Sequence, residues 1–255
     1  MIILEKDRIT TIKLNRPRVR NALNPDMIIE LIETLNSLKD DESIRVIILT
    51  GVGSSFSSGA DLDWLKEIGE HSYEQNLSES AKFVELVNTI HNFPVPIISM
   101  VNGPAIGAGA GIALASDIVV ASKTAVFGIS EVAIGIVPAA IIPLVKSRLG
   151  ETKSREYLIT GERIDAQTAS KIGMINYTVN DYKLEDFTKE IAERIVKNGP
   201  KAVKRVREMI TKVDHLIGNE LNEYLTKEVA EVRTSEEGRE GMRAFLEKRK
   251  PNWRV

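Results

Sequence analysis

Apolar and polar residues alternate from the start of the chain in a pattern typical of short strands. Ile9, Ile12 and Leu14 are separated by polar residues and follow the polar pair Lys6-Asp7. This pattern predicts a hairpin of two strands, at residues 3–5 and 8–14.

The next stretch has the period of a helix. Asn24 followed by Pro25 is typical of a helix start. Apolar residues then recur at helical spacing, at Met27, Ile28, Leu31, Ile32, Leu35 and Leu38. Residues 45–50 follow as an apolar run that predicts a buried strand. The order strand, helix, strand predicts a right-handed crossover unit.

The middle of the chain alternates between polar and apolar segments. Residues 71–80 are polar and aperiodic, which predicts either a mobile loop beside a substrate tunnel or a plain surface loop. The pattern after this loop predicts a helix at 80–92, a strand at 97–101, a helix of small residues at 108–116, strands at 118–121 and 125–127, and a helix from Pro138 to Leu149.

After Gly150 the chain becomes helical, with charged outer faces. The predicted helices span residues 153–160, 165–171, 184–197, 200–212, 219–233 and 236–248. Two of them carry apolar stripes suited to packing against helices of the same chain or of a neighbour, formed by Val203, Val206, Met209 and Ile210 and by Leu221, Leu225, Val229 and Val232.

Two glycine-rich turns each follow an apolar strand and lead into helix-forming residues. They are Ser-Ser-Gly-Ala-Asp at 57–61 and Asn-Gly-Pro-Ala-Ile-Gly-Ala-Gly-Ala-Gly at 102–111. A helix start offers free backbone N–H groups and a dipole that favours negative charge. Only small residues let a substrate oxygen reach the main chain. Either turn alone is equally well explained by tight packing, but together they predict an enzyme that holds an oxyanion.

Spacing excludes three competing motifs. Gly107-x-Gly109 would begin a dinucleotide fingerprint, but Ile112 stands where a small residue is needed. A phosphate-binding loop ending in Gly-Lys-Ser/Thr is absent from the sequence. Gly128-Ile129-Ser130 would begin a nucleophile elbow, but Val132 takes the place of its second glycine.

Composition narrows the function further. A chain of 255 residues can form one domain with a substantial core. A net charge of −2 and only 5% aromatic residues argue against nucleic acid as a partner. The chain has no cysteine, and His71, His91 and His215 lack metal-ligand spacing, so no metal site is expected.

The protein is expected in the cytoplasm and off the membrane. The first residues lack the layout of a signal peptide. The apolar stretch at 93–121 is interrupted by prolines, glycines, Asn102 and Asp117, which argues against a membrane span.

A set of motifs, in order along essentially the whole chain, resembles the enoyl-CoA hydratase/isomerase (crotonase) family. They are Asn15-Arg16-Pro17, Asn21-Ala22-Leu23, Phe56-Ser57-Ser58-Gly59-Ala60-Asp61-Leu62, Val101-Asn102-Gly103-Pro104-Ala105-Ile106-Gly107-Ala108-Gly109, Asp117-Ile118, Phe127-Gly128-Ile129-Ser130-Glu131, Gly135-Ile136-Val137-Pro138 and Phe245-Leu246-Glu247-Lys248-Arg249. The resemblance implies an α/β fold, a crotonase-like spiral of ββα units. Residues 1–195 would form the core with the acyl-CoA site, and residues 196–255 a helical region that forms homotrimers or hexamers built as pairs of trimers.

The resemblance also implies the catalytic groups. A thioester carbonyl would lie between the backbone N–H groups of Ala60 and Ala108, and Glu131 would exchange a proton with the substrate. The neighbours of this glutamate are mostly apolar, at Phe127, Ile129, Val132 and Ile134. Apolar surroundings disfavour a charged carboxylate, so the pKa of Glu131 is expected to be raised.

One position departs from the two-carboxylate hydratases of the family. They place a second glutamate where this chain has Gly111. One alternative is a hydratase with a single glutamate, as in proteins resembling methylglutaconyl-CoA hydratase, which residues 131–143 resemble more closely. The other is an isomerase that moves a double bond from a 3-enoyl-CoA to a 2-enoyl-CoA. We favour the hydratase. A non-catalytic acyl-CoA-binding protein is a third alternative, against which Glu131 argues.

Matched positions further imply how CoA is bound. Arg18, Val19 and Arg20 would line the phosphate and pantetheine path, and Ser58, Asp61 and Leu62 would lie near the adenine and pantetheine. Phe245 and Lys248 would reach CoA, commonly from the neighbouring subunit. Ordinary solvated charge is the alternative for Arg18, Arg20 and Lys248. CoA is part of the substrate, so no cofactor is expected. Asp63 and Trp64 are candidates for the border of the acyl pocket.

Overall fold

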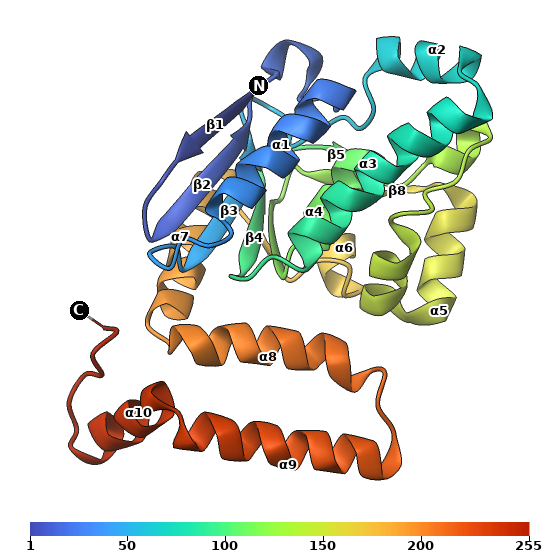
Figure 1. Ribbon diagram of the computed structural model, residues 1–255. Helices are drawn as coiled ribbons and strands as arrows, with labels where there is room; N and C mark the ends of the chain where they lie inside the picture. The colour runs from blue at the N-terminus through green and yellow to red at the C-terminus, as the bar shows by residue number, and fades with distance from the viewer. Residues whose placement is uncertain (255) are drawn as a thin grey trace.

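The computed structural model describes residues 1–254 and contains two β-sheets. The larger has the strand order β1-β2-β3-β4-β6-β9 (Figure 1). Its strands are β1 (Ile2–Glu5), β2 (Ile9–Leu14), β3 (Val46–Gly51), β4 (Ile97–Val101), β6 (Ile118–Ser122) and β9 (Tyr177–Val179). The predicted hairpin is confirmed, since β1 and β2 pair in antiparallel register, and the other neighbours pair in parallel.

The smaller sheet supplies the second layer of the spiral. It has the order β5-β7-β8, formed by β5 (Ala105–Ile106), β7 (Val126–Gly128) and β8 (Arg163–Asp165). The chain therefore adds short strands and a helix in turn, as the predicted spiral of ββα units requires. The predicted crossover is also confirmed, because β2 and β3 are parallel and joined through α1 (Pro25–Leu38).

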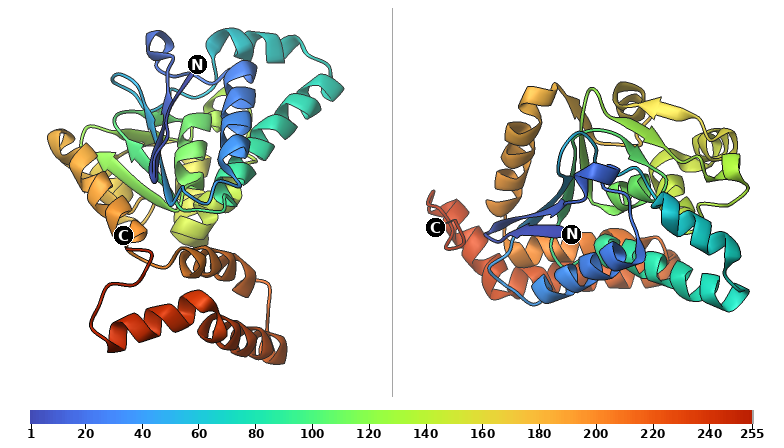
Figure 2. Two further views of the ribbon diagram at one scale, coloured as in Figure 1. Left: turned by 60° about the vertical axis from the view of Figure 1, so that its left-hand side comes forward. Right: turned by 90° about the horizontal axis from the view of Figure 1, so that it is seen from above.

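Both faces of the larger sheet are covered. Helices α1, α3 (Tyr73–His91) and α4 (Ala108–Ala115) lie on one side, and α7 (Leu184–Val196) lies on the other (Figures 1 and 2). Leu184 and Ile191 of α7 pack against Val46 and Ile98. All six residues of β3 are buried because the sheet is covered on both faces, and this burial fits the apolar run from Val46 to Leu49.

The loop predicted at residues 71–80 is wrong. α3 begins at Tyr73 and runs through most of this segment. Ser72 and Gln75 form a capping box, in which the Gln75 N–H donates to Ser72 Oγ and the Ser72 N–H donates to Gln75 Oε1. The first turns of α3 are mostly exposed, so their side chains show no apolar period, and local capping rather than burial starts the helix.

Of the remaining core helices, α6 (Ala166–Lys171) is close to prediction, and α5 (Ile142–Thr160) covers two predicted helices. α2 (Leu62–Glu70) follows the first glycine turn, where helix-forming residues were noted, and the short 3-10 turns η1 (Pro17–Val19), η2 (Glu131–Ile134) and η3 (Asp181–Lys183) were not predicted. α5 begins four residues later than Pro138, because the Pro138 carbonyl first accepts bonds from Ile141 and Ile142 in a tight turn. Gly150 has non-helical angles inside α5, which confirms the break predicted there.

The last three helices extend away from the core as an arm (Figures 1 and 2). They are α8 (Pro200–Val213), α9 (Gly218–Thr234) and α10 (Glu236–Leu246). Arg207 fastens α8 to the core, since its Nε lies 2.5 Å from Asp117 Oδ1 and its Nη2 donates to the His91 carbonyl. Large apolar side chains remain exposed on the arm of the single chain, namely Val206, Ile210, Ile217, Leu225, Val229, Met242, Phe245 and Leu246.

Candidate active site

The two glycine turns lie side by side. Ser57 pairs with Ala105, and the Ile106 N–H donates to the Ser57 carbonyl at 3.0 Å. A Cβ placed on Gly59 would lie 3.7 Å from the backbone nitrogen of Ala108. The same added atom would lie 2.7 Å from the carbonyl oxygen of Ile106, which explains why a residue without a side chain is needed there.

The first turn is held on its other side by the segment that follows η1. Ser58 donates to the Arg20 carbonyl at 2.9 Å, and Leu23 donates to the Gly59 carbonyl at 2.7 Å. Because a trans peptide directs its C=O and N–H in opposite directions, the Ala60 N–H points away from Leu23. It therefore faces the side on which the second turn lies.

Both predicted donors are free. Neither the Ala60 nor the Ala108 N–H donates a hydrogen bond to any residue in the range 1–254. Ala108 is the first residue of α4, where a backbone N–H has no partner within the helix. Gly107, which precedes it with a φ of 51°, is fixed by its own bond to the Gly128 carbonyl at 2.7 Å.

Glu131 lies beside Gly107, the residue that precedes the Ala108 amide. It opens η2, three residues after Gly128, and its Oε1 is 3.3 Å from the position that a Cβ on Gly107 would take. Its Oε2 is buried and forms no hydrogen bond with the residues that the structure describes. A buried oxygen without a partner is costly for stability and is typical of a group that acts on a substrate.

Burial of the side chain raises the pKa of Glu131 above the ordinary glutamate value. The predicted direction is therefore confirmed, but only part of the predicted surroundings contributes. Phe127 and Ile129 are buried, whereas Val132 and Ile134 point outward and are exposed. The raised pKa brings the carboxyl closer to the pH at which a general acid and base is most effective.

The place that a side chain at Gly111 would enter is already filled. An added Cβ would lie 2.8 Å from Cγ1 and Cδ1 of Ile141 and 3.4 Å from Cζ of Phe83. Ile141 is a buried residue that immediately precedes α5, and Phe83 belongs to α3. α3, α4 and the start of α5 therefore meet at Gly111, and apolar groups occupy the space that a side chain there would need.

The residues expected near CoA fall into two groups. Arg18 and Val19 lie in the exposed η1 turn, and Arg20 follows it. Ser58 Oγ donates to the Val19 carbonyl at 3.3 Å, so η1 adjoins the first glycine turn. Leu62 is exposed at the start of α2. Phe245 and Lys248 lie at the end of the arm, apart from the glycine turns (Figure 1). The single chain does not bring these two residues to the site.

Asp61 is largely occupied by protein contacts. Its Oδ1 accepts from the Asp63 N–H, which caps α2, and its Oδ2 lies 2.9 Å from Nη2 of Arg16. Burial alone would raise the pKa of Asp61, but the Asp63 hydrogen bond and the Arg16 guanidinium outweigh it and lower this pKa. Its carboxylate thus shapes the turn.

Of the two candidates for the border of the acyl pocket, one is exposed and the other packs against the core. Asp63 is exposed and pairs with Lys66. Trp64 is half-buried, packs against the core, and donates from Nε1 to Oε2 of Glu79 on α3 at 3.0 Å. This bond ties α2 to α3 beside the turn that carries Ala60.

Sequence patterns gave no role to Arg16, Asn21 or Ile141. Asn21 is fully buried with a φ of 54°, and its side chain accepts from the Arg16 N–H and donates to the carbonyls of Val52 and Ser55. Its presence in a family motif was a signal. Ile141 carried none, because its contact with Gly111 depends on how α4 and α5 cross.

Three further features of the structure concern metal binding, membranes and a cavity outside the site. Within residues 1–254, no group of three His, Cys, Asp or Glu side chains could hold a metal ion, and no helix is long and apolar enough to cross a membrane.

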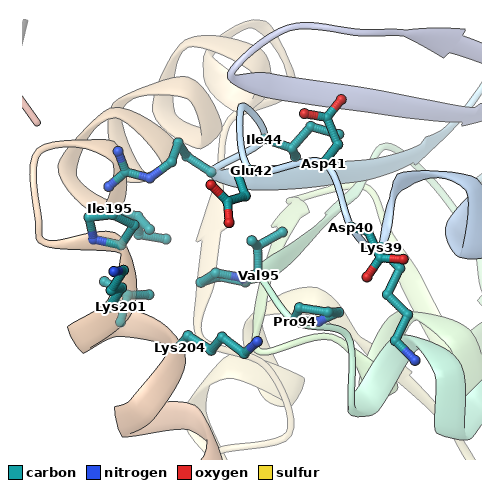
Figure 3. A pocket seen from close by; sticks show the side chains of 14 residues that line it. Lys39, Asp40, Asp41, Glu42, Ile44, Pro94, Val95, Ile195, Lys201 and Lys204 are labelled. Atoms are coloured by element: carbon teal, nitrogen blue, oxygen red, sulfur yellow. The ribbon is translucent and has the colours of Figure 1, made fainter.

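A cavity of about 640 Å³ lies before β3 and β4 and beside α8, at the opposite ends of these strands from the glycine turns. Figure 3 shows Glu42, Val95, Lys201 and Lys204 around it. Glu131 does not line this cavity.

Known proteins resemble this chain over nearly its full length. A short-chain-enoyl-CoA hydratase of Clostridium acetobutylicum is 34% identical, with 98% of this chain and 95% of the relative covered. A crotonyl-CoA hydratase of Syntrophomonas wolfei is 32% identical, with 99% and 97% covered. The crystal structure of an enoyl-CoA hydratase from Shewanella pealeana, 32% identical, superposes with a TM-score of 0.95 over 99% of this chain and 95% of that one.

The family model described as enoyl-CoA hydratase/isomerase matches residues 5–255. Matched length, fold and motif order agree with one another. The chain is therefore a member of the enoyl-CoA hydratase/isomerase family and an enzyme.

Proposed function

We propose that the protein adds water across the double bond of a 2-enoyl-CoA, with the thioester held by two amides and the proton moved by Glu131. One observation carries this proposal. Glu131 has one buried oxygen, Oε2, that lacks a hydrogen-bond partner in the described residues, and its other oxygen, Oε1, lies beside Gly107, the residue before the free N–H of Ala108. A carbonyl oxygen that accepts from Ala108 and Ala60 would place its α- and β-carbons within reach of that carboxylate.

The reaction then follows from the charge movement. Hydrogen bonds from Ala60 and Ala108 draw electrons toward the thioester oxygen, so the β-carbon becomes electrophilic. Glu131 takes a proton from water as the water oxygen bonds to the β-carbon, and the double-bond electrons move to form an enolate. Glu131 then returns a proton to the α-carbon. Each amide stabilises the developing oxyanion by about 2.7–4 kcal/mol.

The filled space at Gly111 makes this a mechanism with one carboxylate. General acid–base catalysis by one group is worth ~10²–10⁴ in rate, so hydration of a straight chain is expected to be slower than with two acids. The curated relatives named for crotonyl-CoA and for short-chain enoyl-CoA support hydration as the reaction and a short acyl chain as the substrate class.

Substrate binding and assembly complete the proposal. Arg18, Val19 and Arg20, together with Ser58 and Leu62, would border the CoA path, and Asp61 would act by holding the turn. The apolar side chains exposed on the arm would be covered in a homotrimer or in a hexamer of two trimers, which brings Phe245 and Lys248 of a neighbouring copy to the site. CoA enters as part of the substrate and no cofactor takes part. We place the enzyme in the cytoplasm, in fatty acid metabolism.

The test offers the protein crotonyl-CoA, 3-methylglutaconyl-CoA and 3-hexenoyl-CoA and follows the absorbance of the conjugated thioester. Hydration lowers the absorbance with the first two, whereas isomerisation raises it with the third. Glu131→Gln should lose the activity by at least about 100-fold and keep CoA binding. Glu162→Gln, at an exposed position, is the control and should keep full activity. Binding without any turnover by the wild type would identify a non-catalytic acyl-CoA-binding protein instead.

A further inference from the structure

Arg16 joins Asp61, the last residue of the first glycine turn, to the segment that follows η1. Its Nη2 lies 2.9 Å from Asp61 Oδ2, and its Nη1 donates to the Ala22 carbonyl at 2.6 Å. The side chains of Arg16 and Asp61 are only 20% and 13% exposed, so water competes little for the pair. A guanidinium suits this place because its planar fork serves two acceptors at once.

The segments joined in this way hold both peptide planes around Ala60. Leu23, which follows Ala22, donates to the Gly59 carbonyl at 2.7 Å and accepts from the Asp61 N–H at 2.8 Å. The peptide between Gly59 and Ala60 is trans, as are all peptides in the described range, so fixing the Gly59 carbonyl fixes the direction of the Ala60 N–H. The pair of Arg16 and Asp61 completes this clamp, because Arg16 also holds the Ala22 carbonyl and so links Asp61 to the segment that carries Leu23.

We propose that Arg16 is a positioning residue for the oxyanion hole, which acts through Asp61 to aim the backbone N–H of Ala60 at the thioester oxygen. The inference rests on the proposed function and adds a residue to it. Arg16 does not touch the substrate. The direction of one N–H group depends on it.

Position matters at this donor because the transition state is stabilised only when the N–H meets the developing charge. A displacement of about 1 Å can cost on the order of 100-fold in rate. Arg16→Ala is therefore expected to lower kcat on crotonyl-CoA by about 10- to 100-fold, with KM changed less than threefold. Arg16→Lys should recover only part of the loss, since a single ammonium lacks the planar fork that serves Asp61 and Ala22 together.

Asp61→Asn tests whether Arg16 acts through this partner. Asparagine keeps an oxygen that can cap α2 but removes the charge that pairs with Arg16. If both residues belong to one clamp, the double variant should be no slower than the slower single variant. Losses in kcat that multiply in full would show independent roles and overturn the proposal.

A spectroscopic measurement separates positioning from a general loss of stability. In Glu131→Gln, which cannot turn over, bound crotonyl-CoA should show a thioester C=O stretch at lower frequency than in water, because the two amides polarise it. Adding Arg16→Ala should reduce this shift while the ligand remains bound. An unchanged shift in the folded, saturated double variant would overturn the proposal.

Arg45 provides the matched control. It also holds backbone carbonyls, those of Val196 and Asn198, but it precedes β3, at the end of the sheet opposite the glycine turns. Arg45→Ala should lower the melting temperature without lowering kcat. A wild type that hydrates no enoyl-CoA would refute the proposed function, whereas an active wild type with an equally active Arg16→Ala variant would refute only this inference.

Discussion

The contact between Gly111 and Ile141 can be tested by adding a single methyl group. Gly111→Ala places a Cβ 2.8 Å from two carbons of Ile141, in a region where neither side can move into solvent. Overpacking of this kind costs about 1–3 kcal/mol. Alanine in place of glycine inside a helix returns about 0.5–1 kcal/mol. The net expectation is a loss of up to about 2 kcal/mol in the free energy of unfolding.

The same substitution should behave differently once Ile141 has been shortened. Ile141→Ala removes both carbons that the new methyl would meet, and by itself costs about 2–5 kcal/mol. In that background Gly111→Ala keeps only its helical benefit and should stabilise the protein. The coupling energy between the two sites is then about 1–3 kcal/mol.

Urea unfolding of the four proteins, at one protein concentration so that assembly is held constant, measures this coupling. The slopes of the unfolding curves should agree, and only the midpoints should move. A coupling energy below about 0.5 kcal/mol would mean that Ile141 does not fill the space beside Gly111. Ile28→Ala is the control, because Ile28 is a buried apolar residue of α1 that is not among the nearest contacts of Gly111. Its effect on the free energy of unfolding should add to that of Gly111→Ala without coupling.

Three further predictions concern the carboxylate and its missing partner. Because burial raises the pKa of Glu131, the acidic limb of the kcat profile on crotonyl-CoA should fall above the ordinary glutamate pKa, and a limb at or below that value would contradict the burial. The folded state binds the Glu131 proton more tightly than the unfolded state, so the contribution of Glu131 to stability is lost as pH rises through its folded pKa. Glu131→Gln should therefore have a higher melting temperature than the wild type at pH 7 but not at pH 4. Equal melting temperatures at pH 7 would be evidence against an unsatisfied buried charge at Glu131. The double variant Gly111→Glu/Ile141→Ala should hydrate crotonyl-CoA faster than Ile141→Ala alone. Gly111→Glu alone should hydrate it no faster than the wild type. A faster rate in that single variant would mean that the space beside Gly111 is open.

Most of the secondary structure could be predicted from interactions between residues that are close in the sequence. Asn24 and Pro25 begin α1 as predicted, because a cap and a preset proline act within one turn. β3 begins with the apolar run from Val46 to Leu49, as expected for a strand that is buried on both faces. The start of α3 was missed although its capping box is written in the sequence, since an exposed first turn has no apolar period to reveal it.

In the candidate site too, the sequence indicated the groups, and the tertiary structure brought them together. The sequence, through its resemblance to the enoyl-CoA hydratase/isomerase family, indicated which groups could do chemistry. They are the main-chain N–H groups of Ala60 and Ala108, among small residues, and the carboxyl of Glu131, whose neighbours in the sequence are mostly apolar. Whether these groups meet depended on hydrogen bonds between segments far apart in the chain, such as that from Gly107 to Gly128.

Only the tertiary structure decided the surroundings of these groups. Ile141 and Phe83 fill the space at Gly111 because α3, α4 and α5 cross there, and helix crossing is set by packing over the whole core. Arg16 meets Asp61 because the segments that follow β2 and β3, two neighbouring parallel strands, leave the sheet at the same end. Sequence patterns report the next few residues, whereas contacts across 30 or more positions depend on the path of the folded backbone.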